Sequence, residues 1–159
     1  MVVNLATAFL ASWVVGLFES SIHKVSVLAV FMPIVAGMGG NGGTQTLTVI
    51  TRGIALGEIE LDAGLRPMLR EVLIGLSIGT VTGMLTALGA YLWRGSPTLG
   101  LVLLLAMILN MVVAGLSGAA ILLILRALRQ DPALGSGVIV TTFTDVFGFL
   151  SFLGLATLL

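Results

Sequence analysis

The stretch that decides the fold is PIVAGMGGNGGTQ, residues 33–45, which contains five glycines, one proline and two side-chain amides. It lies inside a segment without any charged residue, from Val25 to Thr51. A helix of about 20 residues crosses a hydrocarbon core of about 30 Å, so this segment is long enough to span a membrane. Glycine and proline are the residues least compatible with a helix. Their position in the middle of a spanning segment predicts an unusual local structure.

The composition of the whole chain indicates an integral membrane protein. The 159 residues are 58% hydrophobic and only 9% charged, and the mean hydropathy is +1.20. Soluble domains carry about 25% charged residues, so this chain lacks the polar surface that water requires. The zero net charge gives no field that would attract nucleic acid, and the absence of cysteine excludes disulfides and thiolate metal sites.

Charged residues divide the chain into five apolar segments, each of which we expect to form a membrane-spanning helix. The N-terminal segment lacks the basic start of a signal peptide, so we expect it to be retained as a helix. The five segments run from about Val2 to Phe18, between Lys24 and Arg52, from Val72 to Trp93, between Gly95 and Leu125, and from about Val138 to the C-terminus.

The distribution of basic residues predicts the orientation of these helices. Lys and Arg of short loops favour the cytoplasmic side of a membrane. With a cytoplasmic N-terminus, the inner loops carry five basic residues and the outer loops carry two. The five are Arg52, Arg66, Arg70, Arg126 and Arg129, and the two are Lys24 and Arg94. We therefore expect a multi-pass protein of the cell (inner) membrane whose N-terminus is cytoplasmic and whose C-terminus is outside.

The glycine-rich segment has two interpretations. Small residues four apart, such as Gly39 and Gly43, let helices pack closely. Alternatively the helix is interrupted, and freed carbonyls face an ion or its water shell where the backbone lines a wet cavity. Asn41 and Gln45 favour the second interpretation, because close packing does not need two amides. We therefore expect an interrupted second span, whereas the small-residue rows at 75–83 and 114–120, which carry no amide, are expected to serve packing.

Asp145, in VIVTTFTDVFGFLSF (residues 138–152), is the only ionisable residue deep within a predicted span. An aspartate at the centre of a spanning helix costs about 2.5–3.5 kcal/mol on insertion scales. The side chain is therefore protonated and bonded to a neighbouring helix, exposed to water, or bound to a cation. We favour the cation, because carboxylates inside membranes commonly mark ion pathways. Thr141 lies four residues earlier and shares the same helix face.

The available ligands indicate a hard cation. Carboxylate, carbonyl, hydroxyl and amide oxygens suit Mg²⁺, Ca²⁺ and Mn²⁺, whereas the single histidine, His23, lies near the end of a span. Mg²⁺ keeps several waters and is held by one or two carboxylates, while Ca²⁺ takes six to eight oxygens. One aspartate per subunit therefore fits Mg²⁺ best, and the sequence leaves open whether Mn²⁺ or Co²⁺ also passes.

Four motifs resemble, in order and spacing, the transmembrane part of the MgtE family of Mg²⁺ transporters and channels. PIVAGMGGNGGTQTLTVITRGIALGEI (33–59) resembles the signature of the family's second span, and LREVLIGLSIG (69–79) resembles the start of the third. DPALGSGVIVTTFTDVFGF (131–149) resembles the last span, and GLFES (16–20) fits the first. We expect residues 1–159 to form a single MgtE-like transmembrane pore domain, either truncated or naturally stand-alone, without the cytosolic N-terminal and CBS domains of typical members.

The resemblance implies a homodimer in the lipid bilayer with five spans per subunit, a cation pore on the dimer axis, and Mg²⁺ transport rather than an enzymatic reaction. The family's pore carboxylate falls on Asp145, and the backbone positions that face the hydrated ion fall near Thr141 and Gly137. The glutamate that opens the third span falls on Glu71. The second-span signature falls on Pro33, Gly37, Gly40, Asn41, Gly43 and Gln45.

Three other functions fit parts of the sequence. Asp145 could carry protons in a proton-coupled exchanger of divalent cations. The chain could also be a non-transporting membrane assembly subunit, which would leave the amides and Asp145 without a purpose. An intramembrane aspartyl protease needs two carboxylates that share a proton, and only one lies at depth in this chain.

Overall fold

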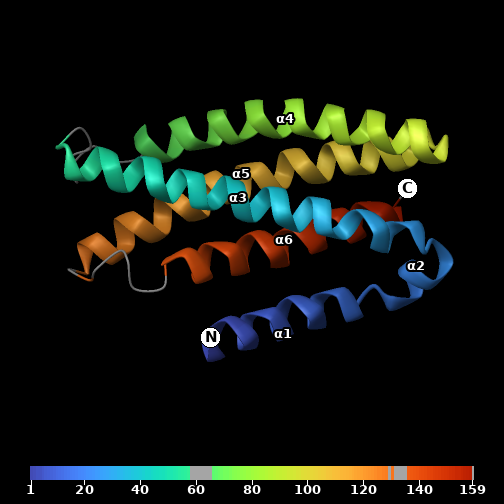
Figure 1. Ribbon diagram of the computed structural model, residues 1–159, viewed down its shortest axis with the longest axis horizontal. Coiled ribbons are helices and arrows are strands. Elements are labelled where there is room, and N and C mark those ends of the chain that lie inside the picture. Colours follow the sequence, from blue (N-terminus) through green and yellow to red (C-terminus); the bar gives the residue numbers. More distant parts are fainter. Residues whose placement is uncertain (58–65, 129, 131–135, 159) are drawn as a thin grey trace.

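The structure is a computed structural model that describes residues 1–57, 66–128, 130 and 136–158. Within these residues the regular secondary structure is helical throughout, which confirms the predicted all-α fold (Figure 1). The helices are α1 (Val2–Gly16), α2 (Glu19–Lys24), α3 (Val27–Ala55), α4 (Arg66–Arg94), α5 (Pro97–Ala127) and α6 (Ser136–Leu158).

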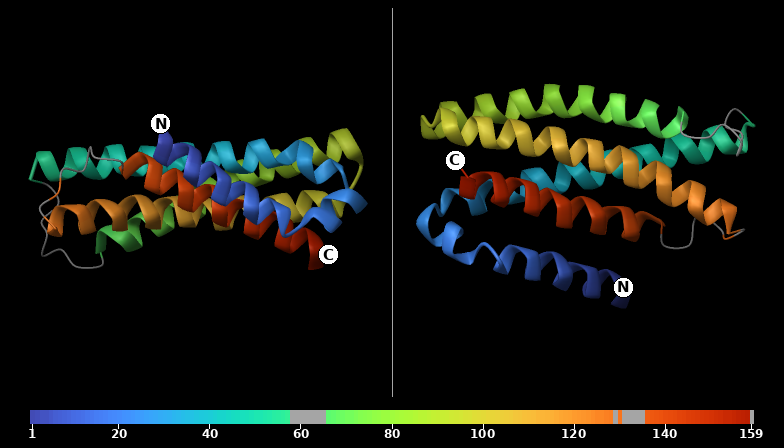
Figure 2. Two further views of the ribbon diagram at one scale, coloured as in Figure 1. Left: turned by 90° about the horizontal axis from the view of Figure 1, so that it is seen from below. Right: turned by 180° about the vertical axis from the view of Figure 1, so that it is seen from behind.

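The long helices lie side by side along one axis, with α5 in the centre of the bundle (Figures 1 and 2). Helix α5 packs against α4, α3 and α6, and α3 also packs against α6. Helix α1 lies at the edge and packs mainly on α6. The larger apolar core forms between α3, α5 and α6 around Val35, Leu103, Met107 and Phe152, all of them almost fully buried.

The expected interruption of the second span is wrong, because α3 is a continuous helix through the glycine-rich segment. Gly39 and Gly43 lie on its buried side, where an added Cβ would collide with the side chains of Asn110 and Val140 respectively. These glycines allow close contact between helices rather than a break in one. A continuous helix pairs its own backbone groups at membrane depth, and close packing offsets a glycine penalty of about 1 kcal/mol per residue.

The small-residue rows at 75–83 and 114–120 pack as predicted. A Cβ added at Gly79 of α4 would lie 2.8 Å from the Cα of Ile108 in α5. A Cβ added at Gly115 of α5 would lie 2.7 Å from the backbone oxygen of Glu71 in α4. The two helices therefore touch backbone to backbone, which only small residues permit.

Among the described residues, four helices are long and apolar enough to cross a membrane, namely α3, α4, α5 and α6. Helix α1 is apolar but has only 15 residues. At a rise of 1.5 Å per residue such a helix is about 22 Å long, which is shorter than a hydrocarbon core of about 30 Å. The first predicted span reaches Phe18, whereas α1 ends at Gly16, and short α2 then leads the chain into α3.

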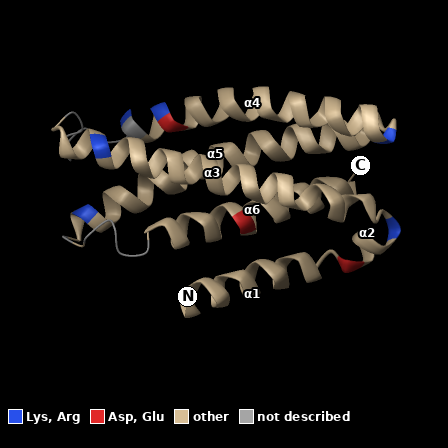
Figure 3. Ribbon diagram, viewed as in Figure 1, with Lys and Arg blue, Asp and Glu red and all other residues tan. Residues whose placement is uncertain are grey.

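Charged residues gather towards the two ends of the bundle, and one acidic position lies midway along α6 (Figure 3). One end carries Arg52 near the end of α3, Arg66 and Arg70 at the start of α4, and Arg126 at the end of α5. Lys24 and Arg94 lie at the opposite end. This grouping agrees with the one used to predict the orientation, although Arg129 lies outside the described residues.

Candidate cation pathway

Four exposed polar side chains follow one another along the middle of helix α3 and are here called the polar face: Asn41, Thr44, Gln45 and Thr48. They line an open groove together with Val49. The Thr44 hydroxyl donates to the Gly40 carbonyl at 2.8 Å, and the Thr48 hydroxyl donates to the Thr44 carbonyl at 2.9 Å. Each hydroxyl hydrogen is used within the helix, so the oxygen lone pairs remain available to water or a cation. Such a face does not suit lipid, and it needs water or a protein partner.

Helix α6 contributes a second row that starts beside the polar face. Gly137, Thr141 and Asp145 recur every four residues, share one side of α6 and are all partly exposed. An ideal Cβ built on Gly40 lies 3.6 Å from the Cγ2 of Thr141, so α3 and α6 meet at this point. The carboxylate of Asp145 therefore belongs to a helix that borders the polar face.

The backbone around Thr141 is already hydrogen-bonded. Thr144 Oγ1 donates to the Thr141 carbonyl at 3.0 Å, and Thr141 Oγ1 donates to the Val138 carbonyl at 3.1 Å. Both carbonyls lie inside continuous α6. Direct metal coordination by these carbonyls would compete with those bonds, whereas contact through a water molecule needs only a free lone pair. The geometry thus suits a cation that keeps its hydration shell.

Asn110 of α5 packs between α3 and α6, a role that was not predicted from the sequence. Its side chain is 1% exposed, and Nδ2 donates to the Val35 carbonyl at 2.8 Å. The amide fills the space beside Gly39 of α3 and Gly148 of α6, which is three residues beyond Asp145. Its Oδ1 has no hydrogen-bond partner among the described residues. The feature of the sequence that could have indicated this role is that Asn110 is the single side-chain amide in α5, the most apolar helix.

Glu71 lies past the first turn of α4, which begins at Arg66, so it does not cap the start of this helix. The side chain points into the bundle and is only 6% exposed. Its Oε2 accepts a hydrogen bond from Thr46 Oγ1 of α3 at 3.0 Å. Small residues of α5 make this contact possible, because Cβ atoms at Gly115 and Gly118 would crowd Glu71 and Thr46 respectively.

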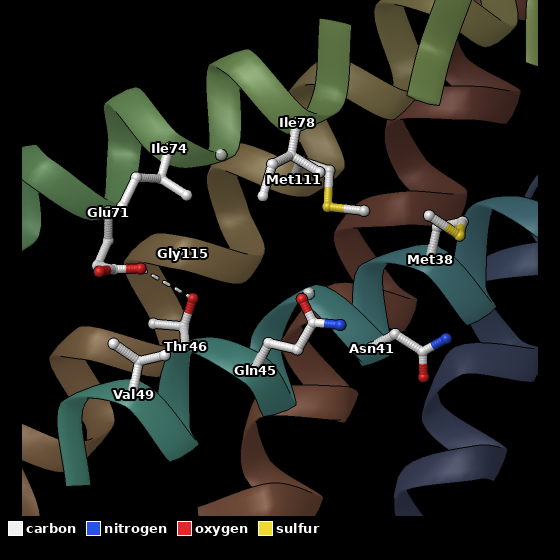
Figure 4. Close-up of a pocket in the computed structure, with 12 residues that line it drawn as sticks. Met38, Asn41, Gln45, Thr46, Val49, Glu71, Ile74, Ile78, Met111 and Gly115 are labelled. Atoms are coloured by element: carbon white, nitrogen blue, oxygen red, sulfur yellow. Dashed lines mark hydrogen bonds between the residues drawn. The ribbon is translucent and has the colours of Figure 1, made fainter. Parts of the chain in front are cut away.

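A cavity of about 250 Å³ adjoins this pair between α3, α4 and α5 (Figure 4). Figure 4 shows Glu71 and Thr46 reaching towards each other, with the Gln45 amide pointing into the same space and the Asn41 amide pointing away from Glu71. The remaining wall is largely apolar and consists of Met38, Gly42, Val49, Ile74, Gly75, Ile78, Met111 and Gly115.

The structure brings some of the predicted site residues together and separates others. Asn41, Gln45 and Gly40 lie at or beside the polar face, next to the row on α6. Gly43 is buried in the packing, and Glu71 faces the cavity. The two earlier signature positions, Pro33 and Gly37, are exposed on α3. In the described part of the chain no three His, Asp or Glu side chains cluster into a metal cage.

Comparison with known proteins shows the family to which the chain belongs. The family of divalent cation transporters named MgtE matches residues 32–155. The magnesium transporter MgtE of Bacillus subtilis is 34% identical over 157 residues, which cover 99% of this chain and 35% of that protein. The corresponding protein of Thermus thermophilus is 36% identical over 159 residues, or 100% of this chain and 35% of the relative.

A third relative, the magnesium transporter MgtE of Enterococcus faecalis, is 37% identical over 142 residues, which cover 89% of this chain and 31% of that protein. The chain thus spans about one third of the length of these relatives. The family match covers most of the chain and agrees with the resemblance of its motifs. This chain belongs to the MgtE family of divalent cation transporters.

Proposed function

We propose that this chain forms the membrane pore of a magnesium transporter and that two copies are needed to complete it. The observation that carries the proposal is a half-buried carboxylate, Asp145, on a helix that borders the exposed polar face of α3. The three relatives described above are magnesium transporters, which supports Mg²⁺ as the transported ion.

The polar face supports a homodimer. A second copy related by a two-fold axis would place an identical polar face opposite the first, because such an interface is self-complementary. The two faces would enclose a water-filled path and shield each other from lipid. Five spans per subunit follow if α1 crosses the bilayer with local thinning, which shorter helices can induce at a modest cost.

Electrostatics supports a cation at Asp145. Two carboxylates about 8 Å apart across a two-fold axis repel each other by about 2 kcal/mol at an effective dielectric constant of about 20. A divalent cation between them removes this repulsion. Each Asp145 would contact the hydrated ion, and the backbone oxygens near Thr141 and Gly137 would bind its outer waters. Mn²⁺ accepts the same oxygen ligands as Mg²⁺, and Co²⁺ remains a candidate.

The membrane potential is sufficient to drive the flux. Two charges that cross a potential of 100 mV release about 4.6 kcal/mol, at about 2.3 kcal/mol per charge. With the Arg-rich end of the bundle in the cytoplasm, the negative interior of a cell would draw Mg²⁺ inwards. We assign the chain to the cell (inner) membrane with its N-terminus in the cytoplasm and its C-terminus outside.

The test is Mg²⁺ flux into liposomes that contain the purified chain, an encapsulated Mg²⁺ indicator and an imposed potassium diffusion potential. Asp145→Asn keeps the size of the side chain and removes its charge, and we expect it to lower the flux at least tenfold. The matched control is Ser151→Ala on the same helix, because among the described residues the Ser151 hydroxyl bonds only to the Gly148 carbonyl of its own helix, at 3.1 Å. The control should transport like the wild type.

Unchanged, selective Mg²⁺ flux in Asp145→Asn would remove the carboxylate from the mechanism. Repeating the assay with a protonophore at a clamped potential separates a pore from a proton-coupled exchanger. A pore conducts equally with and without the proton gradient, whereas an exchanger stops. Wild-type protein that gives no flux under any potential would favour an assembly subunit.

A further inference from the structure

Glu71 is a buried carboxylate that no described basic side chain neutralises. Its described hydrogen bond comes from the uncharged Thr46 hydroxyl. Arg66 and Arg70 lie on the same helix, but both are exposed, and no described Lys, Arg or His nitrogen lies within 4.0 Å of the carboxylate. Removing a carboxylate from water costs several kcal/mol unless a positive charge compensates it. The site therefore needs a cation or a proton.

The cavity favours a cation over a proton. A protonated Glu71 bonded to Thr46 would need no space beside it, yet the carboxylate borders a cavity of about 250 Å³. Six waters around Mg²⁺ occupy about 180 Å³, at about 30 Å³ per water, so a hydrated ion fits. The Gln45 amide points into the same space and supplies another oxygen (Figure 4).

The cavity is continuous with the proposed ion path. Asn41, Gln45 and Val49 line both the cavity and the open groove along the polar face. An ion that moves along the polar face would thus pass the mouth of the cavity. Apart from Glu71, the α4 residues that line the cavity are Ile74, Gly75 and Ile78, so the oxygen atoms that face the space come from Glu71, Thr46 and Gln45.

The spacing along the bundle separates Glu71 from Asp145. Helices α3 and α6 are antiparallel (Figure 1) and meet where Gly40 contacts Thr141. Thr46 lies six residues beyond Gly40 on α3, which is about 9 Å, and Asp145 lies one turn, about 6 Å, in the opposite direction. The two carboxylates therefore lie on the order of 15 Å apart along the axis of the bundle. The carboxylates beside each ion offset part of the repulsion between two divalent cations at this distance.

We propose that Glu71, Thr46 and Gln45 form a second site for a hydrated divalent cation, beside the pore and nearer to the Arg-rich end of the bundle. The proposal rests on the proposed function, since it takes the polar face as the ion path. The site retains an ion between Asp145 and the Arg-rich end of the pore. The positive charge of this ion compensates the buried negative charge of Glu71.

The test is Mn²⁺ binding to the full chain in detergent, measured by electron paramagnetic resonance as the loss of the free Mn²⁺ signal. We expect Asp145→Asn to retain a bound Mn²⁺ that the double variant Asp145→Asn/Glu71→Gln loses. Glutamine keeps the acceptor for Thr46 and the size of the side chain, and removes the charge. The control is Glu19→Gln in the same background, because Glu19 is an exposed carboxylate at the opposite end.

Equal Mn²⁺ binding by Asp145→Asn and the double variant would overturn the second site, while the flux result for Asp145 would still decide the proposed function. Conversely, loss of binding only in the double variant supports the site even if Asp145→Asn transports normally. Should Glu71→Gln fail to fold, Gln45→Ala in the Asp145→Asn background replaces it. We then expect about tenfold weaker binding, equivalent to one hydrogen bond to a charged group, and unchanged affinity would overturn the proposal.

Discussion

Gly39→Ala is the substitution that most directly tests how α3 is held in the bundle. The added Cβ would lie 2.8 Å from Cγ and 2.9 Å from Oδ1 of Asn110, with Nδ2 closer still. The amide has no room to withdraw, because a Cβ at Gly148 on the other side would lie only 2.7 Å from the same Nδ2. We therefore expect both that α3 is pushed outwards and that Asn110 loses its bond to the Val35 carbonyl.

The expected loss of stability follows from three terms. Overpacking of a tight contact costs about 1–3 kcal/mol, and an unpaired buried amide costs about 1–3 kcal/mol. The gain in helix propensity from Gly to Ala returns about 1 kcal/mol. The net destabilisation is about 3 kcal/mol. Gly89→Ala on α4 is the matched control, because among the described residues no atom outside the local helix backbone lies within 4 Å of its added Cβ, and it should be neutral or stabilised by up to about 1 kcal/mol.

The assay is titration of the folded protein from mild detergent into sodium dodecyl sulfate, followed by circular dichroism. Gly39→Ala should unfold at a clearly lower mole fraction of the denaturing detergent than Gly89→Ala. If the two variants unfold within 1 kcal/mol of each other, the contact between Gly39 and Asn110 is not tight, and the packing explanation for the glycine-rich segment is refuted.

Two further predictions concern the packing of α4 and the orientation of the chain. Gly115→Ala should destabilise the protein by about 2 kcal/mol in the same titration, since its Cβ would lie 2.7 Å from the Glu71 backbone oxygen; stability equal to that of Gly89→Ala would contradict it. A reporter fused after Leu159 should be active as alkaline phosphatase and dark as a green fluorescent protein, because the Arg-rich end is expected in the cytoplasm. The opposite pattern would reverse the assigned topology.

Apolar segments between charges predicted the long helices well, because a bilayer leaves few alternatives to a helix. The ends were less certain: α4 begins at Arg66 rather than at Val72, since the helix continues into the polar residues before the span. The first span, by contrast, was predicted to be longer than the helix that forms there. Helix α1 stops at Gly16, although apolar residues continue to Phe18.

The conformation of the glycine-rich segment could not be predicted from its own residues. Glycine permits a break and close packing equally, and the choice depends on what lies opposite. The partner of Gly39 is Asn110, about 70 residues later in the sequence. The interpretation as close packing holds for Gly39 and Gly43, which face inwards, while Asn41 and Gln45 are exposed on the same uninterrupted helix. The inward position of Glu71 likewise could not be predicted from neighbouring residues, because it depends on Gly115 of a different helix, α5.

The continuity of α3 has a consequence for ion selectivity. Its backbone carbonyls are committed to the helix, so an ion beside α3 meets only amides and hydroxyls of side chains. A filter made of carbonyl rings cannot be altered by exchanging single residues, since every amino acid carries the same carbonyl. On the proposed ion path each side-chain contact could be replaced separately. We therefore expect the metal selectivity of proteins of this family to change through point mutations without any change of fold. The positions concerned are Asn41, Thr44, Gln45 and Thr48.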